Sequence, residues 1–197
     1  MKMFKKFVAV MMAAVLSMAM LTACGGGSGS GPSSKLAGIL GSGKIWMDVT
    51  DIETGENNVM ATNGKKFYLE FPHRGEQVKA WIQDGMMYAI MGDLAMKGPF
   101  EDEDGEFEFD TVPTKEDLSK IQIGKYTVNG VEYYAERIQD GDRQSIYCFD
   151  GNKAVYYIEK DTEDERIYKI NQLTGSFDEK KLDPPANVEF LDTSLFD

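Results

Sequence analysis

Apolar and polar side chains alternate along most of the chain after residue 44. In the first such stretch, Ile45, Met47 and Val49 fall on one face and the residues between them fall on the other. A period of two is typical of a β-strand, whose successive side chains point to opposite faces. The alternation predicts about ten strands, at residues 44–50, 67–71, 78–82, 86–91, 94–96, 126–128, 131–139, 144–149, 154–160 and 166–173.

Short turn sequences separate many of these predicted strands. Asn63-Gly64, Asp84-Gly85 and Asn129-Gly130 are examples of pairs that stand between them. Such pairs supply the positive φ angles that two-residue hairpin turns need, so consecutive strands should pair antiparallel. We expect a mainly β fold with two meanders, arranged as an antiparallel sandwich or barrel.

Two brief helices interrupt the β pattern. Apolar residues at helical spacing predict one or two helical turns at residues 36–40, ended by the glycines that follow. Between the two meanders, an acidic loop at residues 101–110 precedes Thr114, which is a predicted N-cap with Asp117 three positions later. That spacing resembles a capping box and predicts a short helix to about residue 121.

The first 23 residues are typical of an export signal. A basic start with three lysines is followed by an uncharged apolar stretch at residues 7–21, which is short for a bilayer span of about 20 residues. Residues 21–24, Leu-Thr-Ala-Cys, resemble the lipobox of bacterial lipoproteins, and this resemblance implies acylation of Cys24 after cleavage. The alternative is an ordinary secretory signal followed by an incidental cysteine.

The expected order of segments follows from this signal. Residues 1–23 form the lipoprotein signal peptide, residues 24–34 form the acylated cysteine and a Gly/Ser-rich tether, and residues 35–197 form a single β domain. Two acyl chains make a stable membrane anchor, whereas one gives only reversible binding. We therefore expect a lipid-anchored protein on the extracytoplasmic face of the cell membrane.

The charge of the chain limits its partners. Removing residues 1–23 takes away three lysines and no acidic residue, which moves the formal net charge from −12 to −15. Nucleic-acid binding depends on neutralising phosphates with Lys and Arg, and anionic lipid surfaces repel such a chain. We expect no nucleic-acid partner, and we expect the acyl chains of Cys24 to provide the membrane contact.

The motifs that would indicate catalysis or metal binding are incomplete. Residues 38–44 have the spacing of a phosphate-binding loop, but Ile45 replaces its Ser or Thr. Residues 102–105 do not match a calcium loop, and His73 is the single histidine. Cys148 is the only thiol besides Cys24 and is expected in a strand core. We expect no enzyme activity, no metal and no cofactor; a catalytic role would require a cluster around His73 or the carboxylates.

Large flexible apolar side chains gather in one predicted hairpin region. Methionine adapts its shape and suits surfaces that accept varied apolar partners. We predict an apolar ligand-binding wall made of Trp81, Met87, Tyr88 and Met91. The alternative is an ordinary sheet core filled with methionine, because a period of two is the same in a hollow and in a filled barrel.

Several strand-turn-strand segments resemble the LolA-like superfamily of bacterial lipoproteins. They are residues 81–88, 124–136 and 147–153, and residues 177–188 resemble the closing proline-containing segment of that family. The resemblance implies a half-open antiparallel β-barrel with short helices over an apolar cavity. It also implies binding or carriage of a lipid or other apolar ligand. A sensor that binds another envelope protein through a filled domain is the second hypothesis.

Overall fold

The computed structural model describes residues 34–100, 118–162 and 164–193. The elements in the first half are α2 (Lys35–Leu40), β1 (Ile45–Asp51), β2 (Asn57–Thr62), β3 (Phe67–His73), β4 (Glu76–Gln83), β5 (Met86–Met91) and β6 (Leu94–Pro99). Those in the second half are β7 (Gln122–Val128), β8 (Val131–Asp140), β9 (Arg143–Asp150), β10 (Lys153–Lys160), β11 (Glu165–Thr174), the 3-10 helix η1 (Glu179–Leu182) and β12 (Leu191–Asp192).

All these strands belong to one sheet of 12 strands. Their order is β12-β6-β5-β4-β3-β2-β1-β11-β10-β9-β8-β7. Neighbours pair antiparallel except β12 and β6, which pair parallel over two residues. The prediction of a mainly β, antiparallel fold is confirmed, but the sheet is not closed into a barrel.

Each of the ten predicted strands is present, and two further strands, β2 and β12, were not predicted. β2 begins with Asn57 and Asn58, which are typical of turns, and its next four residues are all buried. The strand therefore lacks the alternation of apolar and polar residues on which the prediction depends. β12 is too short to produce a pattern. The predicted helix at 36–40 is confirmed as α2, and residues 118 and 119 are helical. Thr114, the acidic loop at 101–110, Cys24 and all of the tether except Ser34 lie outside the described residues.

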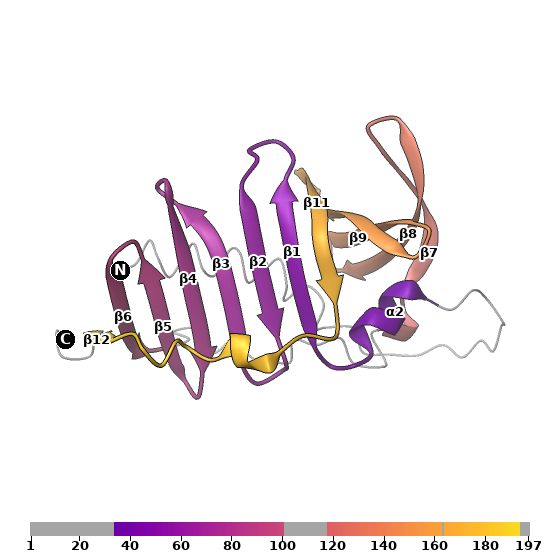
Figure 1. Ribbon diagram of the computed structural model, residues 1–197. Helices are drawn as coiled ribbons and strands as arrows, with labels where there is room; N and C mark the ends of the chain where they lie inside the picture. Colours follow the sequence, from indigo (N-terminus) through magenta and orange to yellow (C-terminus); the bar gives the residue numbers. More distant parts are fainter. Residues whose placement is uncertain (1–33, 101–117, 163, 194–197) are drawn as a thin grey trace.

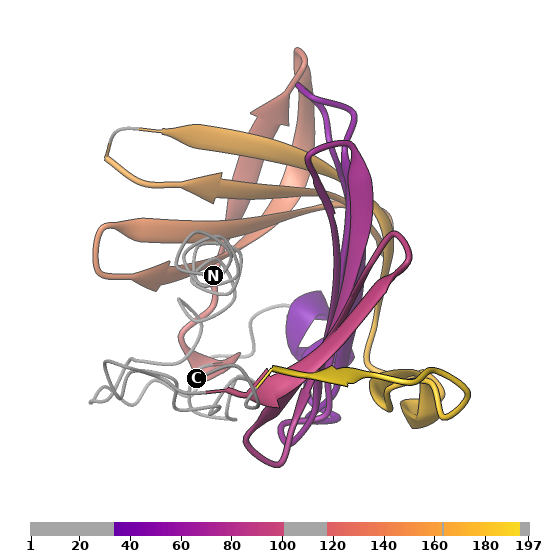
Figure 2. The ribbon, with the colours of Figure 1, turned by 90° about the vertical axis from the view of Figure 1, so that its left-hand side faces the viewer.

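The sheet bends where its two halves meet. In Figure 2 the strands β8–β11 turn away from the layer formed by β1–β6, and α2 lies on the side toward which they turn. The register shifts between Asp48 and Val49, where β1 pairs with β11, and again between Ala154 and Tyr156. Such bulges bend a strand and increase its twist. They therefore help to create an inner face, next to α2, and an outer face.

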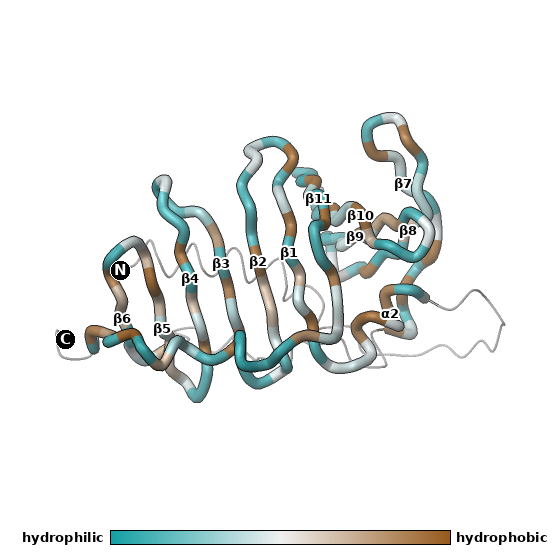
Figure 3. The backbone as a smooth tube through the Cα atoms, in the orientation of Figure 1, coloured by the Kyte–Doolittle hydropathy of each residue, from teal (hydrophilic) through white to brown (hydrophobic). Residues whose placement is uncertain are grey.

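Apolar residues alternate with polar ones along the strands, as Figure 3 shows. The inner face carries the largest group of buried side chains, which we call the inner cluster. Its buried members are Leu36, Leu40, Ile45, Met47, Val49, Met60, Phe67, Leu69, Phe71, Val78, Ala80, Ile82, Ile138, Tyr147, Phe149, Ala154, Tyr157, Tyr168 and Ile170. Both halves of the sheet and α2 thus share one core.

The outer face of the first half is covered by the C-terminal strap, residues 175–193, which runs across the strands in Figure 1. Beneath it, Trp46, Tyr68, Trp81 and Tyr88 lie in one row, with Ala61 of β2 between the first two. Phe177 packs on Trp46 with ring centroids 5.7 Å apart, and Leu182 of η1 is fully buried in the same cluster. The ammonium of Lys181 lies 4.4 Å from the Trp46 ring centroid, and Lys44 forms an ion pair with Glu179.

The outer face of the second half is covered by the β7–β8 hairpin. Tyr126 of β7 packs in one cluster with Ile158 and Ile167, although three strands separate β7 from β11 in the sheet. Tyr126 also hydrogen-bonds the Glu165 side chain, and the Tyr133 and Tyr156 ring centroids are 5.5 Å apart. The β7–β8 hairpin therefore folds over other strands of its own sheet.

We expect Leu182→Ala to detach the strap in part and to lower the free energy of unfolding by about 2–5 kcal/mol, because it opens a cavity at a fully buried site. Both tryptophans of the chain, Trp46 and Trp81, lie in the cluster beneath the strap that contains Leu182. Their fluorescence should shift to the red in this variant under native conditions. Lys180→Ala, an exposed position in the same 3-10 helix, is the control. An unfolding curve identical to the wild type would contradict this role of Leu182.

Candidate functional site

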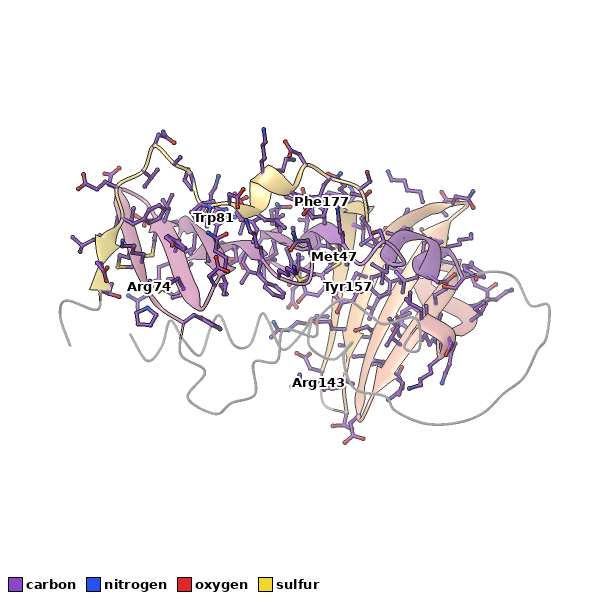
Figure 4. The ribbon with its side chains drawn as sticks, turned by 90° about the horizontal axis from the view of Figure 1, so that it is seen from below. Met47, Arg74, Trp81, Arg143, Tyr157 and Phe177 are labelled. Carbon is purple, nitrogen blue, oxygen red and sulfur yellow. The ribbon has the colours of Figure 1, made fainter. Side chains whose placement is uncertain are left out.

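The four side chains predicted to form one apolar wall lie on two faces of the sheet. Trp81 pairs with Tyr88 across the β4–β5 hairpin, and both point outward under the strap. Met87 and Met91 point inward and pack at the border of the inner cluster. Figure 4 shows Trp81 beside the strap with Phe177, whereas Met47 and Tyr157 lie between the two halves of the sheet.

Trp81 and Tyr88 have specific partners in the strap. The Trp81 indole N–H donates to the carbonyl of Lys181 at 3.2 Å. The ring centroids of Tyr88 and Phe190 are 5.3 Å apart, with the rings nearly perpendicular. These two residues hold the C-terminal strap, so of the predicted wall only Met87 and Met91 face the inner side.

The other sequence candidates occupy structural positions. Lys44, the last residue of the phosphate-loop pattern, precedes β1 and pairs with Glu179 of the strap. Cys148 is fully buried, and burial raises the pKa of its thiol to about 11. His73 ends β3. Within the described residues no three or more His, Cys, Asp or Glu side chains are grouped so as to hold a metal ion, and residues 102–105 lie outside them.

Polar side chains gather on the inner face of the second half, at positions where the alternation leads one to expect a core. We call Ser145, Tyr147, Tyr157, Glu159 and Tyr168 the tyrosine-glutamate cluster. Tyr157 of β10 is directly opposite Tyr147 of β9 and Tyr168 of β11, and Glu159 is opposite Ser145 and Arg166. The sheet register therefore brings these residues together from three strands.

The Glu159 carboxylate is the centre of this cluster. The Tyr157 hydroxyl donates to its Oε1 at 3.0 Å, and the Tyr168 hydroxyl donates to its Oε2 at 3.4 Å. The Ser145 and Tyr157 hydroxyl oxygens are 3.3 Å apart. The ring centroids of Tyr147 and Tyr157 are 5.0 Å apart, and those of Tyr157 and Tyr168 are 5.7 Å apart. Three aromatic rings thus pack next to one carboxylate.

Burial determines the ionisation of these groups. It raises the pKa of the Glu159 carboxyl above its ordinary value of 4.5, although the two tyrosine hydroxyls and the positive charges of Arg166 and Arg143 act in the opposite direction. Burial, followed by the charge of Glu159, raises the pKa of Tyr168 to about 12. A buried carboxyl whose pKa is raised by desolvation is a candidate functional group. The signal in the sequence that could have indicated this cluster is the presence of a Glu and a Ser at inward positions of predicted strands.

The inner cluster reaches the surface at a groove of about 590 Å³ beside α2. Ile39, Ala154 and Leu173 supply its apolar side, and all three also pack in the inner cluster. The remaining lining residues are polar: Asp150, Asn152, Lys153, Asn171 and Gln172. The groove thus offers an apolar floor that continues into the core and a polar rim.

A second buried carboxylate, that of Glu136, fixes α2 to the sheet. The backbone N–H groups of Lys35 and Leu36 donate to it at 2.7 and 2.9 Å, and the Ser34 and Tyr134 hydroxyls donate at 2.6 and 2.9 Å. Four donors compensate its complete burial. Glu136 therefore has a structural role, and it sets the point at which the chain enters the domain.

No protein-family model matches the chain, and no curated protein matches it. Among solved structures, this chain is similar to a protein chain in the structure of PNGF-II in the C2 space group. The TM-score is 0.30, and the sequence identity is 9% over 78% of this chain. The chain spans 31% of the length of that protein chain. A similarity at this level supports no inference about fold or function.

We expect Glu159→Gln to stabilise the fold near neutral pH. Because the folded state raises the pKa of this carboxyl, its contribution to stability is fully present below pH 4.5 and is lost as the pH rises through the raised value. Glutamine cannot ionise, so the variant should avoid that loss, by about 1.4 kcal/mol for each unit of the shift. Urea unfolding just below pH 4.5 and near neutrality measures the difference.

Glu132→Gln is the control for this prediction, because Glu132 lies on the surface and pairs with Lys125. Its stability should follow the pH profile of the wild type. A Glu159→Gln protein that is less stable than the wild type at neutral pH would show that the carboxylate itself stabilises the fold.

Proposed function

We propose that this chain is a membrane-anchored, extracytoplasmic lipoprotein that binds a lipid or other apolar ligand without catalysis. The observation that carries the proposal is the groove beside α2, where Ile39, Ala154 and Leu173 extend the inner cluster to the surface. Its volume of about 590 Å³ is in the range of small-molecule sites, roughly 300–1,000 Å³. Apolar burial would supply the affinity, at about 25 cal/mol for each Å² of apolar surface.

The membrane anchor in this proposal is an acylated Cys24, and the Gly/Ser-rich residues 25–34 act as the tether. The first described element after the tether is α2, which Glu136 holds against the sheet. Ile39 of this same helix lines the groove. The ligand site would therefore lie close to the point of attachment. Among the described residues, no helix has the length and apolar character needed to span a membrane.

The open antiparallel sheet with an apolar inner face is in keeping with a LolA-like domain, which we propose as the family of this chain. The groove and the inward-facing Met87 and Met91 support the carrier role that this family implies. The wall we propose consists of Ile39, Ala154 and Leu173, which line the groove, whereas Met87 and Met91 face the same inner side without lining it. Trp81 and Tyr88 are left out because they pack against the strap.

The second candidate is an envelope sensor or protein-interaction lipoprotein with a filled core. One observation favours it: large side chains of the inner cluster, among them Leu36, Leu40 and Tyr147, are completely buried. A domain with a filled core would bind a protein partner through its surface and would not need to hold a ligand. The two candidates make different predictions for the composition of the purified protein.

The anchor is tested by Cys24→Ser. We expect the wild-type protein in the membrane fraction, with a diacylglycerol-modified amino-terminal peptide by mass spectrometry, and we expect the variant to lose both properties. Cys148→Ala is the matched control, because it removes the other cysteine of the chain and leaves the proposed anchor intact. A Cys24→Ser protein that still sediments with membranes would contradict the proposed anchor.

The ligand is tested with a soluble form that carries a general secretory signal in place of residues 1–23 and Ser at position 24, purified from the envelope without detergent. We expect native mass spectrometry to show a stoichiometric apolar adduct that organic extraction removes. Leu173→Gln should reduce its occupancy several-fold, because it places an amide in the apolar side of the groove.

The matched control is Leu94→Gln, the same substitution at a leucine that is 44% exposed and outside the groove. It should retain the adduct. A wild-type protein with a clean apo mass that also takes up no added lipid would contradict the carrier function and favour a protein partner.

A further inference from the structure

The Glu159 carboxylate forms no ion pair within the described residues. It is largely buried, yet within the described residues no Lys or Arg nitrogen is in salt-bridge contact with it, and both of its hydrogen bonds come from neutral tyrosine hydroxyls. Arg166 lies opposite Glu159 in the sheet, but its side chain hydrogen-bonds Asp164, at 3.2 Å, and Tyr168. An isolated buried carboxylate is costly unless a cation compensates it. Among the described residues, this anion is offset only by the charges of Arg166 and Arg143, which lie outside ion-pair contact with it.

The surroundings of Glu159 suit one kind of cation. A carboxylate offers about four lone-pair positions, and the two tyrosine hydroxyls use two of them. The Tyr157 and Tyr168 hydroxyls contact the carboxylate, and the Tyr147 ring packs on that of Tyr157. Aromatic rings thus adjoin the carboxylate, and tyrosine rings attract alkylammonium groups. Glu159 itself is partly exposed and lies one residue before the end of β10.

The cluster continues into the apolar surface on which the proposed function rests. Ala154, Tyr157 and Glu159 follow one another along the inner side of β10. Ala154 also lines the groove beside α2. Five residues of strand span about 17 Å, which separates a carboxylate at one end from an apolar groove at the other. That arrangement matches a molecule with a positive head and an apolar tail.

We propose that the tyrosine-glutamate cluster binds the ammonium head group of a cationic amphiphile whose tail extends toward the groove. This inference deepens the proposed apolar-ligand function and depends on it. The charge of the chain, −15 without residues 1–23, favours the approach of cations and repels anionic amphiphiles. The head group provides an ion-pair partner for Glu159, and the tail provides the apolar area.

The test compares three detergents with the same twelve-carbon tail, each below its micelle concentration: dodecyltrimethylammonium, dodecyl maltoside and dodecyl sulfate. Binding to the chain 24–197 with Cys24→Ser is measured by titration calorimetry. We expect the cationic detergent to bind at least tenfold more tightly than the maltoside, and the sulfate to bind most weakly. Glu159→Gln should remove the difference between the cation and the maltoside while leaving maltoside binding unchanged.

Two further variants separate recognition from folding. Tyr168→Phe removes one hydroxyl donor and keeps the ring. The logarithm of the ratio between cation and maltoside affinities should therefore keep at least half of its wild-type value. Glu132→Gln removes one exposed negative charge and should leave the preference intact, which tests whether net charge alone explains it.

The outcomes distinguish this inference from the function on which it rests. Equal affinity for the cation and the maltoside, or a preference that survives in Glu159→Gln, would overturn the head-group site and leave apolar binding in place. Absence of binding by all three detergents would overturn both. A tenfold preference that only Glu159→Gln abolishes would support the site.

Discussion

The constraint on which this structure depends is that an open sheet with two apolar faces must have both of them covered. The bend between β1 and β11 brings the inner faces of the two halves toward each other around α2. The outer faces remain, and they are covered in two different ways. The C-terminal strap covers the first half and the β7–β8 hairpin covers the second. β2, β3 and β4 thereby contribute buried side chains to both faces of the sheet.

The strap illustrates how this coverage is achieved with little regular structure. It contains one turn of 3-10 helix and a two-residue strand, and its contacts come from separate anchors: Phe177, Leu182 and Phe190 pack on the aromatic row. Exposed ion pairs such as Lys66–Asp183 flank these anchors. Surface ion pairs contribute little to stability, so the apolar anchors hold the strap and the charges set its register.

The fully buried Glu136 and the partly buried Glu159 of the second half show how the same residue type takes two roles. Glu136 accepts four hydrogen bonds and fixes α2 against the sheet. Glu159 accepts two, from neutral hydroxyls, and desolvation raises its pKa although the charges of Arg166 and Arg143 act in the opposite direction. Residues that reduce the stability of a fold and are nevertheless placed in its interior are typical of binding sites. The contrast with Glu136 is the reason for assigning Glu159 to ligand recognition.

The sequence alone determined ten of the twelve strands and the antiparallel pairing of neighbours joined by short turns, because period-two alternation and Asn-Gly or Asp-Gly turns act over a few residues. The pairing of β1 with β11 joins distant segments and was decided by the tertiary structure. It also required Met87 and Tyr88 to face opposite sides, since they are adjacent in one strand. Only the tertiary structure decided which side each of them faces, because that depends on a strap nearly 90 residues later in the chain. The burial of Glu136 and Glu159 and the strand β2, which is buried on both faces, likewise arise from contacts between distant segments. A local pattern has no information about such contacts.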